Sequence, residues 1–237
     1  MPAHRPSLFS RMSDRIDVGF LWLKWPFAAL SIVLLVPAIE ACFAVLIGCV
    51  REPRPILPFV GGAGCYLLLW LWLIRWWRTT FFSTLEHELT HSLFAVLTFH
   101  KVVGLRTSWS QGGHMRFVGR GNWLITLAPY FFPTICWALM LFYWLVPVIP
   151  WEIAHALNGA AFAYHVTSTM RETHAGQSDL QRAGFVYCFA VLPTANLFCN
   201  GLVVAFAYSG PSGAVTFLQN IEIATKSLLA MFGMPHA

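Results

Sequence analysis

The chain has 237 residues, of which 57% are apolar and only 11% charged, and its formal net charge is +5. This composition excludes an ordinary soluble domain, and apolar runs of roughly 20 residues predict helices that cross a bilayer. The positive charge comes from arginines at the ends of these runs, which is typical of contact with anionic lipid, so we expect no nucleic-acid partner.

The predicted elements begin with a basic, partly amphipathic segment over residues 1–25, which we expect to lie at the membrane interface. A transmembrane domain over residues 26–208 follows, and an amphipathic tail covers residues 209–237. The expected membrane helices are residues 26–50, 56–77, 80–99, 122–148, 152–171 and 184–208. The predicted fold class is therefore an all-α, multi-pass integral-membrane protein with about six transmembrane helices.

A polar segment over residues 100–121 separates the third predicted helix from the fourth. Its two apolar-polar alternating stretches flank Gly112-Gly113, which predicts a short β-hairpin with its turn at the two glycines. Two helices separate this segment from the polar stretch 171–183. Because an even number of crossings returns the chain to the same face, we expect the two segments to lie on one side of the membrane.

The third predicted helix carries the sequence His87-Glu88-Leu89-Thr90-His91. Two histidines four residues apart share one face of a helix and can hold one Zn²⁺, while the intervening glutamate can act as a general base on a zinc-activated water. Ionisable groups within a membrane helix cost about 2.5 kcal/mol or more each unless they pair or line a wet cavity, so chance is a poor explanation of this motif. Glu86, by contrast, fits a capping box that begins at Ser83.

A catalytic zinc usually has three protein ligands and one open position. Asp179, in the second polar segment, is the predicted third ligand, because the chain has only three aspartates and the other two lie in the N-terminal segment. His165 is the alternative, either as third ligand or as a stabiliser of the oxyanion. His165 belongs to a polar stripe on the fifth predicted helix that also includes Glu172, and such a stripe must face protein or water.

These motifs resemble the site-2 protease group of intramembrane zinc metallopeptidases. The shared features are His-Glu-x-x-His on a membrane helix, a β-hairpin after it, and a later helix end that carries an aspartate ligand. The resemblance covers residues 79–200 and implies that His87, His91 and Asp179 bind zinc and that Glu88 is the general base. Leu127-Ala128-Pro129 resembles the small-residue and proline element of the group, whereas Leu180 follows Asp179 where the group has glycine.

The sequence therefore predicts a zinc metalloendopeptidase that hydrolyses peptide bonds of membrane-embedded or membrane-associated protein substrates. A zinc-dependent hydrolase of a lipid or of a lipid-linked amide or ester is an alternative, because the same activated water attacks any acyl carbon. A catalytically silent membrane scaffold is the second alternative. The sequence indicates no oligomeric state.

Overall fold

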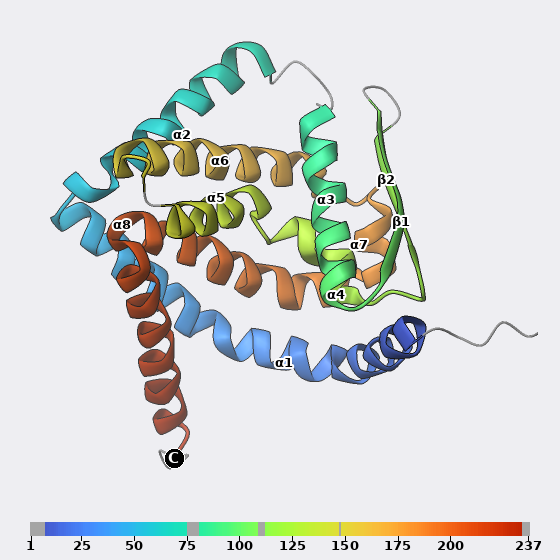
Figure 1. Ribbon diagram of the computed structural model, residues 1–237. Coiled ribbons are helices and arrows are strands. Elements are labelled where there is room, and N and C mark those ends of the chain that lie inside the picture. Colours follow the sequence, from blue (N-terminus) through green and yellow to red (C-terminus); the bar gives the residue numbers. More distant parts are fainter. Residues whose placement is uncertain (1–7, 75–80, 109–111, 147, 234–237) are drawn as a thin grey trace, which may run out of the picture.

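The computed structural model describes residues 8–74, 81–108, 112–146 and 148–233, and the protein is 82% helical (Figure 1). The α-helices are α1 (Leu8–Arg51), α2 (Leu57–Leu69), α3 (Phe81–Leu97), α4 (Trp123–Leu127), α5 (Thr134–Leu145), α6 (Trp151–Glu172), α7 (Ser178–Ala183) and α8 (Phe185–Met231). The strands are β1 (Lys101–Ser108) and β2 (Gly112–Val118). Short turns of other helix types lie before α2 (Arg54–Ile56), after it (Trp70–Ile74) and between α4 and α5 (Ala128–Tyr130).

The two longest helices, α1 and α8, lie side by side along one face of the molecule (Figure 1). Their contact contains a cluster of buried apolar side chains that includes Ala41, Leu202 and Phe217. The Thr194 hydroxyl on α8 donates a 2.7 Å hydrogen bond to the Ser31 carbonyl on α1. This contact fixes the start of α8, and therefore the neighbouring helix α7, relative to α1.

Helix α8 is interrupted at Ser209 and Gly210, which have non-helical backbone angles. Gly210 has φ +62°, a conformation that glycine adopts at little cost, and Pro211 then begins the second helical part. Beyond this kink the helix turns away from the rest of the molecule (Figure 1). The kink lies at the start of the segment that was predicted as the tail.

Helices α2 and α6 cross with their backbones in direct contact, which requires glycine on both helices. A Cβ atom on Gly62 would overlap the carbonyl of Ala156, and one on Gly159 would overlap the carbonyl of Phe59. Small residues at a crossing are typical of helix pairs in membranes, where packing replaces the hydrophobic effect as the source of association.

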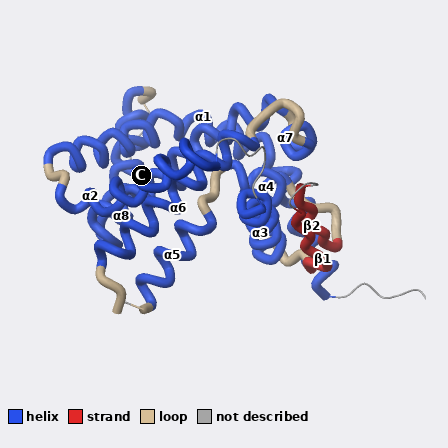
Figure 2. The backbone as a smooth tube through the Cα atoms, turned by 90° about the horizontal axis from the view of Figure 1, so that it is seen from above, coloured by secondary structure: helices blue, strands red, loops and turns tan. Residues whose placement is uncertain are grey.

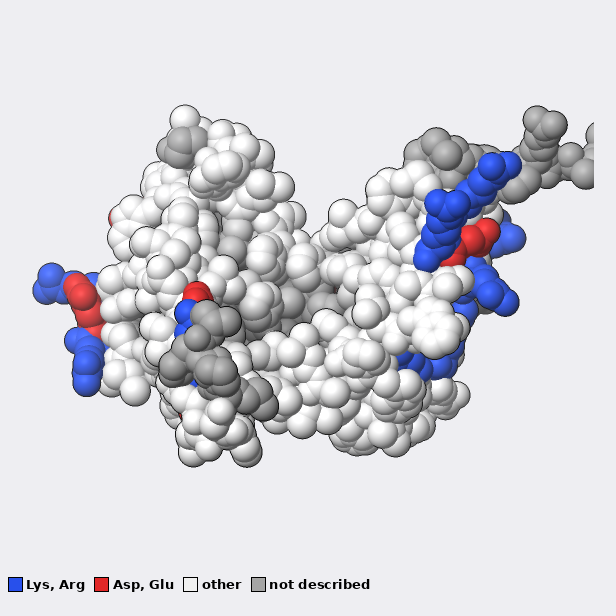
Figure 3. Space-filling view, turned by 90° about the horizontal axis from the view of Figure 1, so that it is seen from below, with Lys and Arg blue, Asp and Glu red and all other residues white. Residues whose placement is uncertain are grey.

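Three helical segments are long and apolar enough to cross a membrane, at Ser10–Arg51, Arg54–Leu73 and Phe185–Met231. The number rises to four if Trp123–Tyr130 and Thr134–Leu145, which meet at 84°, form one broken span. Six spans are therefore not confirmed. Charged residues lie mostly at two ends of the face in Figure 3, and the broad uncharged surface between them suits contact with lipid hydrocarbon.

The remaining two predicted spans, α3 and α6, are helical but do not belong to this apolar set. Helix α3 has 17 residues and includes the His-Glu-Leu-Thr-His motif, while α6 carries the polar stripe. In Figure 1, α3 runs crosswise to α1 and α6 rather than alongside them. Helix α3 thus lies across one end of the helical body, next to the hairpin (Figure 2).

The predicted β-hairpin is confirmed as a two-stranded antiparallel sheet of β1 and β2. The predicted position of its turn is wrong, because Gly112 pairs with Ser108 and Gly113 pairs with Thr107, so both glycines belong to β2. Residues 109–111, which connect β1 to β2, lie outside the described residues. The alternation of apolar and polar residues located the strands, but it could not show how close Gly113 comes to another helix.

The N-terminal segment is joined to the hairpin through Asp17, a buried residue with 6% exposure. Its carboxylate accepts hydrogen bonds from His100 Nε2 (3.1 Å), the Gly121 backbone N–H (3.0 Å) and Asn122 Nδ2 (3.0 Å). These donors stand just before β1 and just after β2, so one side chain of α1 ties both ends of the hairpin. Helix α1 begins at Leu8 and continues without a break through the predicted boundary at residues 25 and 26.

We expect the Asp17→Ala variant to lower the free energy of unfolding by about 3 kcal/mol, because it leaves the buried donors of His100 and Asn122 and the half-buried N–H of Gly121 without their acceptor. Thermal unfolding of the purified protein in detergent measures this effect. Asp14→Ala is the matched control, because Asp14 lies one turn away on the same helix and is exposed. Equal unfolding temperatures for the two variants would show that the buried carboxylate does not secure the hairpin.

Candidate metal centre

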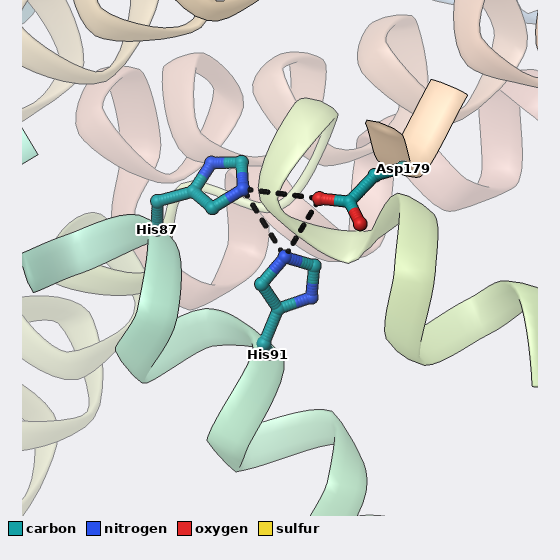
Figure 4. A group of neighbouring side chains, drawn as sticks. All are labelled: His87, His91 and Asp179. Carbon is teal, nitrogen blue, oxygen red and sulfur yellow. Dashed lines mark hydrogen bonds and ion pairs between the residues drawn. The ribbon is translucent and has the colours of Figure 1, made fainter. Parts of the chain in front are cut away.

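Helix α3 places the side chains of His87 and His91 on the same face, one helical turn apart. Their Nε2 atoms are 3.1 Å apart, and the centroids of the two rings are 4.7 Å apart. Both rings point toward α7 (Figure 4). The structure thus brings the two imidazoles of the motif to one point.

Asp179 lies in the first turn of α7 and reaches the same point from the opposite side. Its Oδ2 atom is 3.2 Å from His91 Nε2 and 3.5 Å from His87 Nε2 (Figure 4). Neighbouring ligands of a tetrahedral zinc ion with bonds of 2.0–2.1 Å are about 3.3 Å apart. The three donor atoms therefore have the spacing of a metal site, and the group could hold a metal ion.

Hydrogen bonding by His91 leaves a lone pair free for such an ion. His91 Nδ1 is 2.7 Å from the carbonyl oxygen of Ile125 on α4. Because a carbonyl oxygen only accepts, Nδ1 carries the proton and the lone pair of the neutral ring is on Nε2. That lone pair points at the nitrogen of His87 and at the carboxylate of Asp179, and a cation satisfies such a convergence of acceptors.

Asp179 supplies an anionic oxygen to this group. Burial alone disfavours the charged carboxylate, but its close interactions with the rings of His87 and His91 outweigh burial and hold the pKa of Asp179 well below its usual range. The side chain is therefore a carboxylate at neutral pH. Two imidazoles and one carboxylate form a donor set that divalent transition metals bind.

The three donors open into a cavity of about 540 Å³. Its walls include Glu88 of α3, Gly113 and Met115 of β2, and Glu172 at the end of α6. Glu88 is buried, with 9% exposure, and lies directly behind Gly113. The two polar segments that were expected on one side of the membrane meet here, and Arg182 Nη2 donates a 3.0 Å hydrogen bond to the Arg120 carbonyl.

His165, the alternative third ligand or oxyanion stabiliser, lies apart from the three donors. Its buried ring has Nδ1 3.9 Å from Glu86 Oε1 and Nε2 3.5 Å from the Thr169 hydroxyl. It lines a small inner cavity behind His87 instead of the large one. The geometry therefore favours Asp179 over His165 as the third donor.

The predicted capping role of Glu86 is wrong, because α3 has already begun at Phe81 and Ser83 lies within the helix. Glu86 is a buried residue, with 7% exposure, that faces α6. The capping pattern of Ser83 and Glu86 coincided by chance with a helix that begins earlier.

A protein-family model described as Peptidase M50B-like matches residues 61–170. The matched span includes α3 and the hairpin and ends before α7, so Asp179 lies outside it. The match is consistent with a site-2 protease-like family and confirms the resemblance stated from the motifs. It supports a membrane metallopeptidase in general. No curated protein and no solved structure matches the chain.

Replacement of Asp179 by alanine should weaken metal binding by more than the roughly 10–100-fold typical of a lost outer-shell partner, because a donor atom itself is removed. His165→Gln should retain the metal, since His165 lies outside the donor group. Competition with a chromogenic chelator measures the affinity of both variants for Zn²⁺. The reverse pattern, with metal lost only in His165→Gln, would make His165 the third ligand.

Proposed function

We propose that the chain is an intramembrane zinc metalloprotease that hydrolyses peptide bonds of membrane-embedded or membrane-associated proteins. The observation that carries this proposal is the convergence of His87, His91 and Asp179 beside Glu88 in one open cavity. Zinc suits the donor set, because catalytic zinc sites combine three nitrogen or oxygen donors with one open position. The family match supports the same class of enzyme.

A zinc ion held by these donors would polarise the substrate carbonyl and lower the pKa of a water molecule to about 7. Glu88 would accept a proton from the attacking water on a carboxylate oxygen and pass it to the leaving amine. Its place in the motif suits this role, because Glu88 follows His87 directly and lines the cavity without joining the donor group. Burial shields Glu88 from bulk solvent on the side covered by β2.

Strand β2 is positioned to hold a peptide substrate in an extended conformation. In the described sheet β2 pairs only with β1, and residues of β2 border the cavity, which suits strand addition at its other edge. Residues of β2 line the cavity beside Glu88, and among them is Gly113. This arrangement supports a peptide substrate over a lipid, because backbone hydrogen bonding at a strand edge recognises an extended polypeptide.

A Glu88→Gln variant should bind Zn²⁺ as the wild type does but cleave substrate about 10²–10⁴-fold more slowly, because the amide cannot accept the proton. The assay is mass spectrometry of products from a library of transmembrane peptides reconstituted with the full chain in liposomes. Glu152→Gln, an exposed change on α6, is the control with wild-type cleavage. Wild-type cleavage rates in Glu88→Gln would rule out Glu88 as the general base.

The same assay separates the two alternative functions. Hydrolysis of liposome lipids without cleavage of peptides would support the lipid hydrolase. A wild-type protein that contains no zinc would support the catalytically silent scaffold.

Gly113→Ala should slow cleavage by about 10- to 100-fold while zinc remains bound, because displacement of a catalytic group by about 1 Å can cost 10²-fold. A Cβ atom at this position would lie 2.5 Å from Glu88 Cγ and 2.5 Å from Thr84 Cγ2. Gly104→Ala in β1 is the matched control, because a Cβ there meets nothing within 4 Å. The same cleavage assay compares the two variants, and equal rates would show that contact between β2 and Glu88 is unimportant.

A further inference from the structure

Glu172 is the last residue of α6, and its carboxylate lies behind His87. Glu172 Oε2 is 3.1 Å from His87 Nδ1, and the Glu172 side chain is 17% exposed. The polar stripe of α6 was visible in the sequence, but the partner of Glu172 was not, because 85 positions separate the two residues. The contact joins the end of α6 to the motif on α3.

Glu172 and His87 together separate two cavities. Both residues line the large cavity that contains the donor group, and both also line the inner cavity with Glu86 and His165. The inner cavity is small, about 10 Å³, which is about the space of one water molecule. Glu172 therefore lies at a wall between the candidate metal site and a buried polar interior.

The nitrogen that Glu172 contacts is the one that does not face the donor group. The two ring nitrogens of His87 lie at different positions on the ring, with Nε2 toward Asp179 and Nδ1 toward Glu172. Glu172 thus approaches the ring from the side away from the point where the donors meet, which makes it unsuitable as a further ligand. An ionised carboxylate only accepts hydrogen bonds, so it favours the tautomer of His87 with the proton on Nδ1.

We propose that Glu172 is a positioning residue that fixes the tautomer and the ring orientation of His87, so that the Nε2 lone pair is directed at the metal. The part of this inference that concerns the metal rests on the proposed function. Ile125 does the same for His91 through a main-chain carbonyl. The two histidines are thus oriented by different groups: a side-chain carboxylate contacts His87, and a main-chain carbonyl contacts His91. Carboxylate partners of this kind raise the affinity of a histidine for its metal.

The first experiment measures the affinity of the full chain for Zn²⁺ by chelator competition in Glu172→Ala and Glu172→Gln. Glu172→Ala should weaken binding by about 10–100-fold, and Glu172→Gln should fall in between, because the amide oxygen still accepts a hydrogen bond. Glu152→Ala and Glu152→Gln, exposed on the same helix, should match the wild type. Wild-type affinity in both Glu172 variants would overturn the proposal. If Glu172→Ala does not fold, the nearly isosteric Glu172→Gln carries the test.

The second experiment reads the tautomer without metal and without activity. Nitrogen-15 NMR of ring-labelled histidine in the chelator-treated full chain should show His87 protonated on Nδ1 in the wild type and shifted toward Nε2 in Glu172→Ala. An unchanged tautomer in this variant would contradict the proposal even if Glu88→Gln abolishes cleavage. Conversely, a wild type that binds no Zn²⁺ would overturn the proposed function, while the tautomer shift would still establish the role of Glu172.

Discussion

The convergence of three acceptor atoms, from His87, His91 and Asp179, is the constraint on which the site depends. These atoms lie 3.1–3.5 Å apart and face one point, an arrangement that repulsion between lone pairs opposes unless a cation or additional protons occupy it. The interval of four residues on α3 brings two of these atoms, from His87 and His91, to the same face of one helix. The third requires α7 to be held against α3, so much of the surrounding structure serves to fix that distance.

The helical body provides this support from outside the site. Helix α8 is packed along α1, and α7 directly precedes α8, so the position of Asp179 follows from the contact of the two longest helices. Asp17 on α1 ties both ends of the hairpin, and the hairpin in turn covers Glu88. One helix thus positions elements on two sides of the cavity. Helix α3 lies across the end of this body, where polar residues can meet water while apolar helices contact lipid.

The orientation of the two histidine rings is fixed by groups that lie outside the three donor atoms. The Ile125 carbonyl and the Glu172 carboxylate lie behind His91 and His87 respectively. Glu172 also borders the inner cavity that contains Glu86 and His165, so the polar stripe of α6 supports the site from behind instead of supplying a ligand to it. This role gives a reason for the polar residues of α6, whose burial in an apolar protein costs free energy.

The sequence by itself determined the helical, membrane-associated class, the hairpin, and the pairing of His87 with His91, because hydropathy, alternation and an interval of four residues are local properties. It also indicated Asp179, since few aspartates were available. The tertiary structure alone decided the distance from Asp179 to the histidines, the separation of His165, the crosswise direction of α3, and the contacts of Asp17 and Glu172. Each of these features depends on contacts between segments that are distant in the sequence. A local sequence pattern does not show which side chains of two helices come into contact when the helices pack together.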